Sequence, residues 1–204
     1  MTSRAPRPAA LLVFWLKSRL LIVKRWLINC FVSPARAHRS HLAIRPTRLL
    51  SSIRSPLFTE TDAAEAQLQL GKIQNLRIAK QSLDGIYLPP NALFSFWAQL
   101  GRPTRRRGYV SGRELRQGCI IPTIGGGLCQ LSNAIYQAAK QANCPIVERH
   151  AHTQIIPGSA AALGEDATVF WNYVDLRFRA TRPTLLRVDI AERDLVVSLY
   201  EAAS

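Results

Sequence analysis

The first clear pattern of hydrophobic positions lies in residues 62–83 and has helical spacing. Asp62 and Glu65 form a capping-box pattern at its start, and Gly85 is placed to end the helix. The stripe consists of Leu68, Ile73, Leu76, Ala79 and Leu83. This pattern predicts a long amphipathic helix.

A second helical pattern follows three consecutive glycines and runs over residues 128–143. Its apolar positions are Leu128, Leu131, Ile135, Ala138 and Ala142. Three glycines give the backbone access to positive φ angles and expose N–H groups. We therefore expect a Gly-rich loop that leads directly into a helix.

The remaining patterned segments favour β-strands. Short strands are expected at residues 93–97 and 111–121, and residues 167–179 alternate between apolar and polar positions. Residues 185–190 and 195–200 are separated by a polar turn and predict an antiparallel hairpin. With no βαβ alternation, the order indicates an α+β fold, a single domain with a mainly antiparallel sheet.

Charge divides the chain into two parts. The formal net charge is +14, but residues 1–58 hold 11 of the 27 Lys and Arg residues and no Asp or Glu. We therefore interpret residues 1–58 as a basic, partly amphipathic N-terminal arm and linker, and residues 59–204 as the domain. A basic arm attracts any polyanion without choosing among them. Because the domain itself is nearly balanced in charge, nucleic acid is an unlikely partner.

The arm begins with an apolar run that charged residues interrupt. Lys17, Arg19, Lys24 and Arg25 leave no stretch long enough to span a bilayer, and the segment is a poor signal sequence. Two alternatives stay open: a helix in a membrane interface, or a helix packed on the domain with its basic residues in water. We expect a cytoplasmic protein or one peripheral at the inner face of the membrane. Residues 33–58 are rich in Ser, Arg and Pro and predict an extended linker.

Cysteine usage points to separate thiols. Four cysteines without a Cys-x-x-Cys pair are neither a disulfide scaffold nor a zinc site of the usual spacing. One Cys119–Cys144 bridge remains as an alternative. We expect no metal and no cofactor.

Cys129 is the residue best placed for chemistry. It lies in the first turn of the predicted helix, where unpaired N–H groups and the helix dipole favour a thiolate. His150 and His152, two residues apart on an extended segment, share one face and could supply a general base. Asp175 or Asp166 could orient the imidazole. Gly125, Gly126, Gly127 and Gln130 are the candidate ligand-binding residues of the loop.

Each of these residues also has a structural interpretation. Cys129 can be a small buried hydrophobic residue, and the glycines can serve close packing or bind an anion with their N–H groups. The histidines can form structural hydrogen bonds with Glu148 or Asp166. A mixed metal site of Cys129, His150 and His152 is chemically permissible, but nothing in the spacing predicts it.

Five stretches of the chain carry a family resemblance: Phe94–Trp97, Gly125–Tyr136, Val147–His152, Ala167–Tyr173 and Asp175–Phe178. Together they resemble the VanW family, bacterial proteins named for an accessory component of vancomycin-resistance clusters. The resemblance covers about residues 60–200. It implies a role connected with glycopeptide resistance and the cell envelope, and it matches Cys129, His150, His152 and Asp175 to family positions.

Three functions remain under consideration. The first is a cysteine-dependent hydrolase or acyltransferase acting on a peptide-like envelope substrate, with Cys129 as the nucleophile. The second is a non-catalytic binding module for a cell-wall or anionic ligand. The third is a basic protein, associated with a membrane by peripheral contact or with nucleic acid, whose function lies in the arm of residues 1–58.

Overall fold

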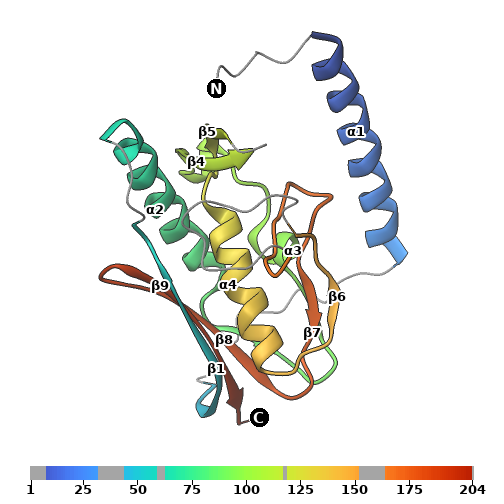
Figure 1. Cartoon of the computed structure of the whole chain (residues 1–204). Helices are drawn as coiled ribbons and strands as arrows, with labels where there is room; N and C mark the ends of the chain where they lie inside the picture. Colours follow the sequence, from blue (N-terminus) through green and yellow to red (C-terminus); the bar gives the residue numbers. More distant parts are fainter. Residues whose placement is uncertain (1–7, 32–43, 59–62, 117–118, 152–163, 204) are drawn as a thin grey trace.

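The computed structural model describes residues 8–31, 44–58, 63–116, 119–151 and 164–203. Its main sheet has four antiparallel strands in the order β1-β9-β8-β2 (Figure 1). The central pair is the predicted C-terminal hairpin, which is confirmed. The strands are β1 (Pro46–Pro56), β2 (Ile86–Leu88), β8 (Thr184–Ala191) and β9 (Asp194–Ala202).

Two smaller antiparallel units complete the β-structure. One is a three-stranded sheet in the order β3-β7-β6, and the other is the hairpin β4-β5. The strands are β3 (Leu93–Ser95), β4 (Ser111–Arg116), β5 (Cys119–Ile124), β6 (Ile146–Glu148) and β7 (Arg177–Arg179).

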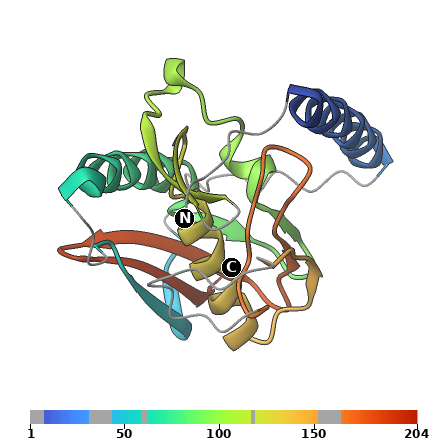
Figure 2. The ribbon, with the colours of Figure 1, turned by 45° about the horizontal axis from the view of Figure 1, so that its top comes forward.

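Two long helices cover this framework, and both are predicted correctly. Helix α2 (Ala63–Leu83) packs against β4 and β8, whereas α4 (Leu128–Gln141) packs against β1 and β9 (Figures 1 and 2). The stripe of α4 is buried, including Leu131 and Ile135 at 0% exposure, because it faces the core between helix and sheet. The α+β prediction is therefore confirmed.

The expected strand at residues 93–97 is only half correct. After β3, the chain winds into the short helix α3 (Phe96–Leu100), followed by the 3₁₀ turn Arg105–Arg107. Ser95 is the N-cap of α3, and its hydroxyl accepts a hydrogen bond from the Ala98 N–H at 3.2 Å. A local side-chain bond therefore ends the strand where the apolar pattern continues.

Two other strand predictions also need correction. The single strand expected at residues 111–121 is the hairpin β4-β5, because a strand there needs a neighbour for its backbone groups. Residues 167–179 form a strand only at β7. An isolated bridge between Phe170 and Val174 closes a turn upstream of it. Alternating apolar and polar residues show only that alternate side chains are buried. A chain that folds back in a turn can bury alternate side chains just as a straight strand does.

The linker prediction is wrong for residues 46–56, which form β1 in the main sheet. This segment is rich in Ser, Arg and Pro because it is an edge strand, with Pro46 and Pro56 at its two ends. Proline and charged side chains are tolerated at sheet edges and discourage pairing with another chain.

Helix α1 (Pro8–Phe31) lies beside this domain, near β6 and the turn before β7 (Figures 1 and 2). Within the described residues, no helix is long and apolar enough to cross a membrane. Of the two alternatives for this segment, packing on the domain is observed, and Lys17, Arg19 and Lys24 are exposed as that alternative expects. The side of the helix that contacts the domain is nevertheless not an apolar one. Arg25 faces the domain, while Leu20 and Phe31 face away from it.

Candidate ligand site at the N-terminus of helix α4

The glycine loop makes a tight turn between β5 and α4. Gly125 and Gly127 have φ angles of +82° and +100°, which only glycine adopts without strain. The N–H of Gly125 donates to Val110 O at 3.1 Å, and that of Gly126 donates to Thr123 O at 2.8 Å. The N–H groups of Gly125 and Gly126 are therefore already hydrogen-bonded to backbone carbonyls. The loop does not present the open row of donors that the sequence suggests.

Gly126 serves close packing. A Cβ on Gly126 would overlap with the carbonyl of Gly112, and a Cβ on Gly112 would lie 2.6 Å from Gly126 O. Asn75, fully buried on α2, joins both sides: its Nδ2 donates to Gly126 O and to Val110 O, both at 3.0 Å. The packing interpretation of this glycine is the one that the geometry supports.

Two backbone donors remain at the helix start. Among the residues that the structure describes, neither Gly127 N–H nor Cys129 N–H has a hydrogen-bond acceptor. Unpaired donors in the first turn of a 14-residue helix lie at the positive end of its dipole. This end of α4 is therefore suited to a negatively charged group.

Lys72 lies directly beside these donors. Its side chain crosses over Gly127, where a Cβ would overlap with the lysine stem, and Lys72 is only 5% exposed. No hydrogen bond or ion pair to Lys72 exists within the described part of the chain. Burial, and to a lesser extent the positive charge of Arg113, lower the pKa of Lys72 from 10.5 to about 8.

The spacing of apolar residues on α2 contains a signal for Lys72, a residue that the sequence-based site prediction lacks. On α2, Lys72 stands four residues after Leu68 and four before Leu76, and it therefore interrupts the apolar stripe. A lysine on the buried face of a helix is rarely left without a partner. Thr168, which contacts Cys129, has no comparable signal in the sequence.

The thiol of Cys129 is held by the segment after residue 164. Its Sγ lies 3.3 Å from Thr168 Oγ1 and 3.6 Å from the carbonyl of Val169. Burial raises the pKa of Cys129 above its ordinary value, partly offset by the hydrogen bond with Thr168, while the charges of Glu114 and Asp166 raise it further. Burial of Cys129 thus opposes the stabilisation of a thiolate that the helix start suggests.

His150 approaches this segment through its backbone. It forms an antiparallel bridge with Thr168, whose N–H donates to His150 O at 2.8 Å. Its imidazole is half exposed, with Nε2 3.5 Å from Glu148 Oε1. In the described region no hydrogen bond joins the imidazole to Cys129 Sγ, and His152 lies outside the described residues.

Asp175 occupies a separate, buried cluster. Its carboxylate, 1% exposed, accepts hydrogen bonds from Ser95 Oγ at 2.6 Å, Arg177 Nε at 2.8 Å and Trp97 N at 3.2 Å. The cluster connects β3, α3 and β7. The observed partners of Asp175 are thus structural, and none of them is a histidine.

Gln130 also has a structural position. Its Nε2 donates to Ser55 Oγ at 2.9 Å and to Pro56 O at 2.7 Å, which ties α4 to the end of β1. The structure therefore brings Cys129 and the backbone of His150 to Thr168, places Gly127 beneath Lys72, and gives Asp175 and Gln130 other contacts.

Cys30, Cys129 and Cys144 are free thiols, so Cys144 forms no disulfide with Cys119. Among the described residues, no group of three His, Cys, Asp or Glu side chains is arranged to hold a metal ion.

The geometry defines the class of protein: a mainly antiparallel α+β domain with a glycine turn before α4. The VanW family, described as VanW like protein, matches residues 71–200, and the chain belongs to this family. The match covers the β2–β9 framework and the glycine loop, but excludes α1 and β1.

Two curated relatives support this assignment. The uncharacterized protein YoaR of Bacillus subtilis (strain 168) is 32% identical over 130 residues, 63% of this chain and 42% of the relative. The vancomycin B-type resistance protein VanW of Enterococcus faecalis (strain ATCC 700802 / V583) is 28% identical over 126 residues, 60% of this chain and 46% of the relative. The matched region thus spans less than half of either relative. No solved structure matches the chain.

Proposed function

We propose that this domain is a binding module for an anionic group, such as a carboxylate, of a peptide-like ligand of the cell envelope. The observation that carries the proposal is Lys72: a residue only 5% exposed, whose stem lies over Gly127 at the start of α4 and whose ammonium has no hydrogen-bond or ion-pair partner among the described residues. Burying a charge without a counter-ion is costly, and a bound anion would supply that counter-ion.

The neighbouring donors support the same ligand chemistry. The unpaired N–H groups of Gly127 and Cys129 lie at the positive end of α4, and Arg113 adds a second cation near Lys72. The enterococcal relative is named for vancomycin resistance, and we propose the envelope ligand for this chain on the basis of that likeness.

The test is calorimetric binding of acetyl-alanyl-alanine with a free carboxylate, of its C-terminal amide and of inorganic phosphate. The Lys72→Met variant keeps the apolar stem and removes the charge. Lys80→Met, at a partly exposed lysine of the same helix that pairs with Asp189, is the matched control. We expect Lys72→Met to weaken carboxylate or phosphate binding at least about tenfold, the loss of one charge-assisted contact. Lys80→Met should bind like the wild type. Equal binding by Lys72→Met, or equal binding of the amide, contradicts the proposal.

The second candidate function is cysteine-dependent hydrolysis or acyl transfer. It is favoured by the unpaired N–H groups of Gly127 and Cys129, which could serve as an oxyanion hole beside the thiol. It is disfavoured by the raised pKa of Cys129. Cys129→Ser discriminates the two: the variant should bind the same probes as the wild type if the domain is a binding module, and should lose cellular function if the thiol is the nucleophile.

A further inference from the structure

Helix α1 presents two opposite faces, and only one of them contacts the domain. Its partly buried residues recur at the spacing of a helical stripe, whereas the other described side chains of α1 are exposed. The inner stripe consists of Ser18, Ile22, Arg25 and Asn29.

The inner stripe is held by polar contacts. The Arg25 guanidinium forms a bidentate pair with Glu148 and donates to Tyr173 O at 3.0 Å. Arg177 Nη2 donates to Asn29 Oδ1 at 2.7 Å. With only 11% of the Arg25 side chain and 18% of the Glu148 side chain exposed, this ion pair is largely shielded from solvent. The docking of α1 thus relies mainly on polar residues: Ile22 is the one apolar member of the inner stripe, and the large apolar residues of the opposite face are exposed.

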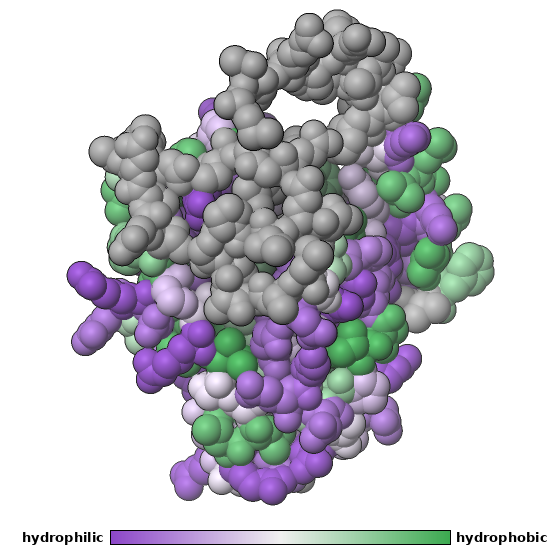
Figure 3. All heavy atoms as spheres, in the orientation of Figure 1, coloured by the Kyte–Doolittle hydropathy of each residue, from purple (hydrophilic) through white to green (hydrophobic). Residues whose placement is uncertain are grey.

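The outer face carries a continuous apolar ridge on the side opposite to the inner stripe. Leu20 is 71% exposed and Phe31 is 87% exposed, values far from those of core residues. Figure 3 shows apolar side chains gathered along the edge of the molecule where α1 lies. The outer ridge consists of Leu16, Leu20, Val23, Leu27 and Phe31.

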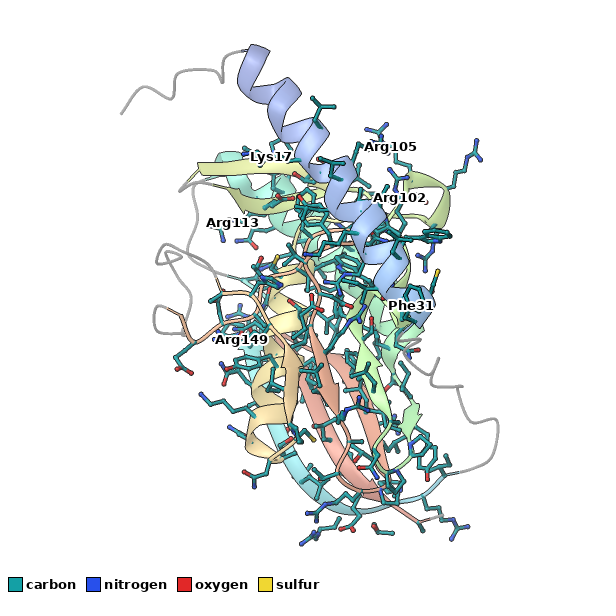
Figure 4. All side chains as sticks on the ribbon, turned by 90° about the vertical axis from the view of Figure 1, so that its right-hand side faces the viewer. Lys17, Phe31, Arg102, Arg105, Arg113 and Arg149 are labelled. Atoms are coloured by element: carbon teal, nitrogen blue, oxygen red, sulfur yellow. The ribbon has the colours of Figure 1, made fainter. Side chains whose placement is uncertain are left out.

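Basic residues border this ridge. Lys17 and Lys24 lie along one side and Arg19 along the other, and all three are exposed. Figure 4 shows α1 lying across the domain, from Lys17 to Phe31. No acidic residue precedes Glu60 in the sequence. An apolar ridge between basic flanks matches a bilayer surface, where acyl chains meet anionic headgroups.

We propose that the outer ridge of α1 inserts into the surface of an anionic lipid bilayer, while the inner stripe holds the domain against it. A second copy of the chain fits this face less well. Two ridges in contact would bring Lys17, Arg19 and Lys24 of both copies together, with no carboxylate in residues 1–58 to pair with them.

The experiment is co-sedimentation of the full chain with vesicles of phosphatidylcholine alone or mixed with phosphatidylglycerol. The Leu20→Glu variant places a charge on the outer ridge. Its matched control is Leu70→Glu on α2, a leucine that is 56% exposed on a different helix and changes the net charge equally. We expect the wild type and Leu70→Glu to bind the anionic vesicles, and Leu20→Glu to bind them at least about tenfold more weakly.

A second variant tests the charge separately. Lys17→Gln combined with Lys24→Gln should weaken binding to phosphatidylglycerol vesicles, and added salt should reproduce this loss in the wild type. Both lysines are exposed, so folding should be unaffected, which circular dichroism checks. Equal sedimentation of wild type and Leu20→Glu overturns the proposal. So does a lipid-free dimer in sedimentation velocity that Leu20→Glu dissociates, without vesicle binding by the wild type.

Discussion

Gly112 and Gly126 are in backbone contact, so neither position has room for a side chain. Gly112 is on β4 and Gly126 is in the loop before α4; Asn75 on α2 donates hydrogen bonds to the carbonyls of Val110 and Gly126. The start of α4, where the candidate ligand site lies, is thereby fixed relative to β4 and α2.

Replacing Gly126 by alanine should destabilise the fold by about 2–3 kcal/mol, because the new methyl group overlaps with backbone that cannot move away. Gly85→Ala is the control: Gly85 has a φ of +81° but open space around it. It should cost only about 1 kcal/mol of conformational strain. Urea unfolding measures both. Equal losses would show that the packing contact contributes little.

Lys72 should make stability depend on pH. Its pKa is lowered in the folded state to about 8 from 10.5, so the unfolded chain holds the proton more tightly between these values. The unfolding free energy of the wild type should therefore rise by about 2–3 kcal/mol from pH 7 to pH 10, and the destabilising charge is fully present below pH 8.

The Lys72→Met variant should lack this rise and be more stable than the wild type at pH 7. Urea unfolding at several pH values, compared between the two proteins, isolates the contribution of Lys72 from that of other groups such as Tyr109. A parallel pH dependence in wild type and variant would mean that Lys72 is charged and satisfied in the fold.

Asp175→Ala should be among the most damaging single changes in the domain. It removes the closest carboxylate from Arg177, which is 4% exposed and otherwise lies 3.5 Å from Glu148. Breaking a buried pair costs about 3–5 kcal/mol. Asp189→Ala, which breaks the exposed pair with Lys80, should cost at most about 1 kcal/mol. Thermal unfolding distinguishes the two, and similar losses would contradict the buried-cluster assignment.

The thiols should differ in their reaction with iodoacetamide at pH 7.5. Cys30 is exposed, whereas burial raises the pKa of both Cys129 and Cys144. Peptide-resolved mass spectrometry should therefore find Cys30 alkylated first and the other two slowly. Faster labelling of Cys129 than of Cys30 would favour the cysteine-dependent function over the binding module.

The elements that the sequence predicts well are those in which local pattern and burial agree. The two long helices and the C-terminal hairpin carry apolar positions at the spacing of their own secondary structure, and the motifs around the glycine loop identify the family. In residues 93–97 and 167–179, the local pattern and the observed structure disagree. There Ser95 and the Phe170–Val174 bridge make contacts that an apolar pattern does not encode.

The sequence by itself determined the fold class, the two helices, the family and the presence of Cys129 at a helix start. The tertiary structure decided what surrounds these residues. It buries Lys72 over Gly127, encloses Asp175 among Ser95, Trp97 and Arg177, and turns Arg25 inward. The physical reason is that burial and pairing depend on residues distant in the chain. The spacing of residues along the sequence does not show which distant side chain will lie in contact.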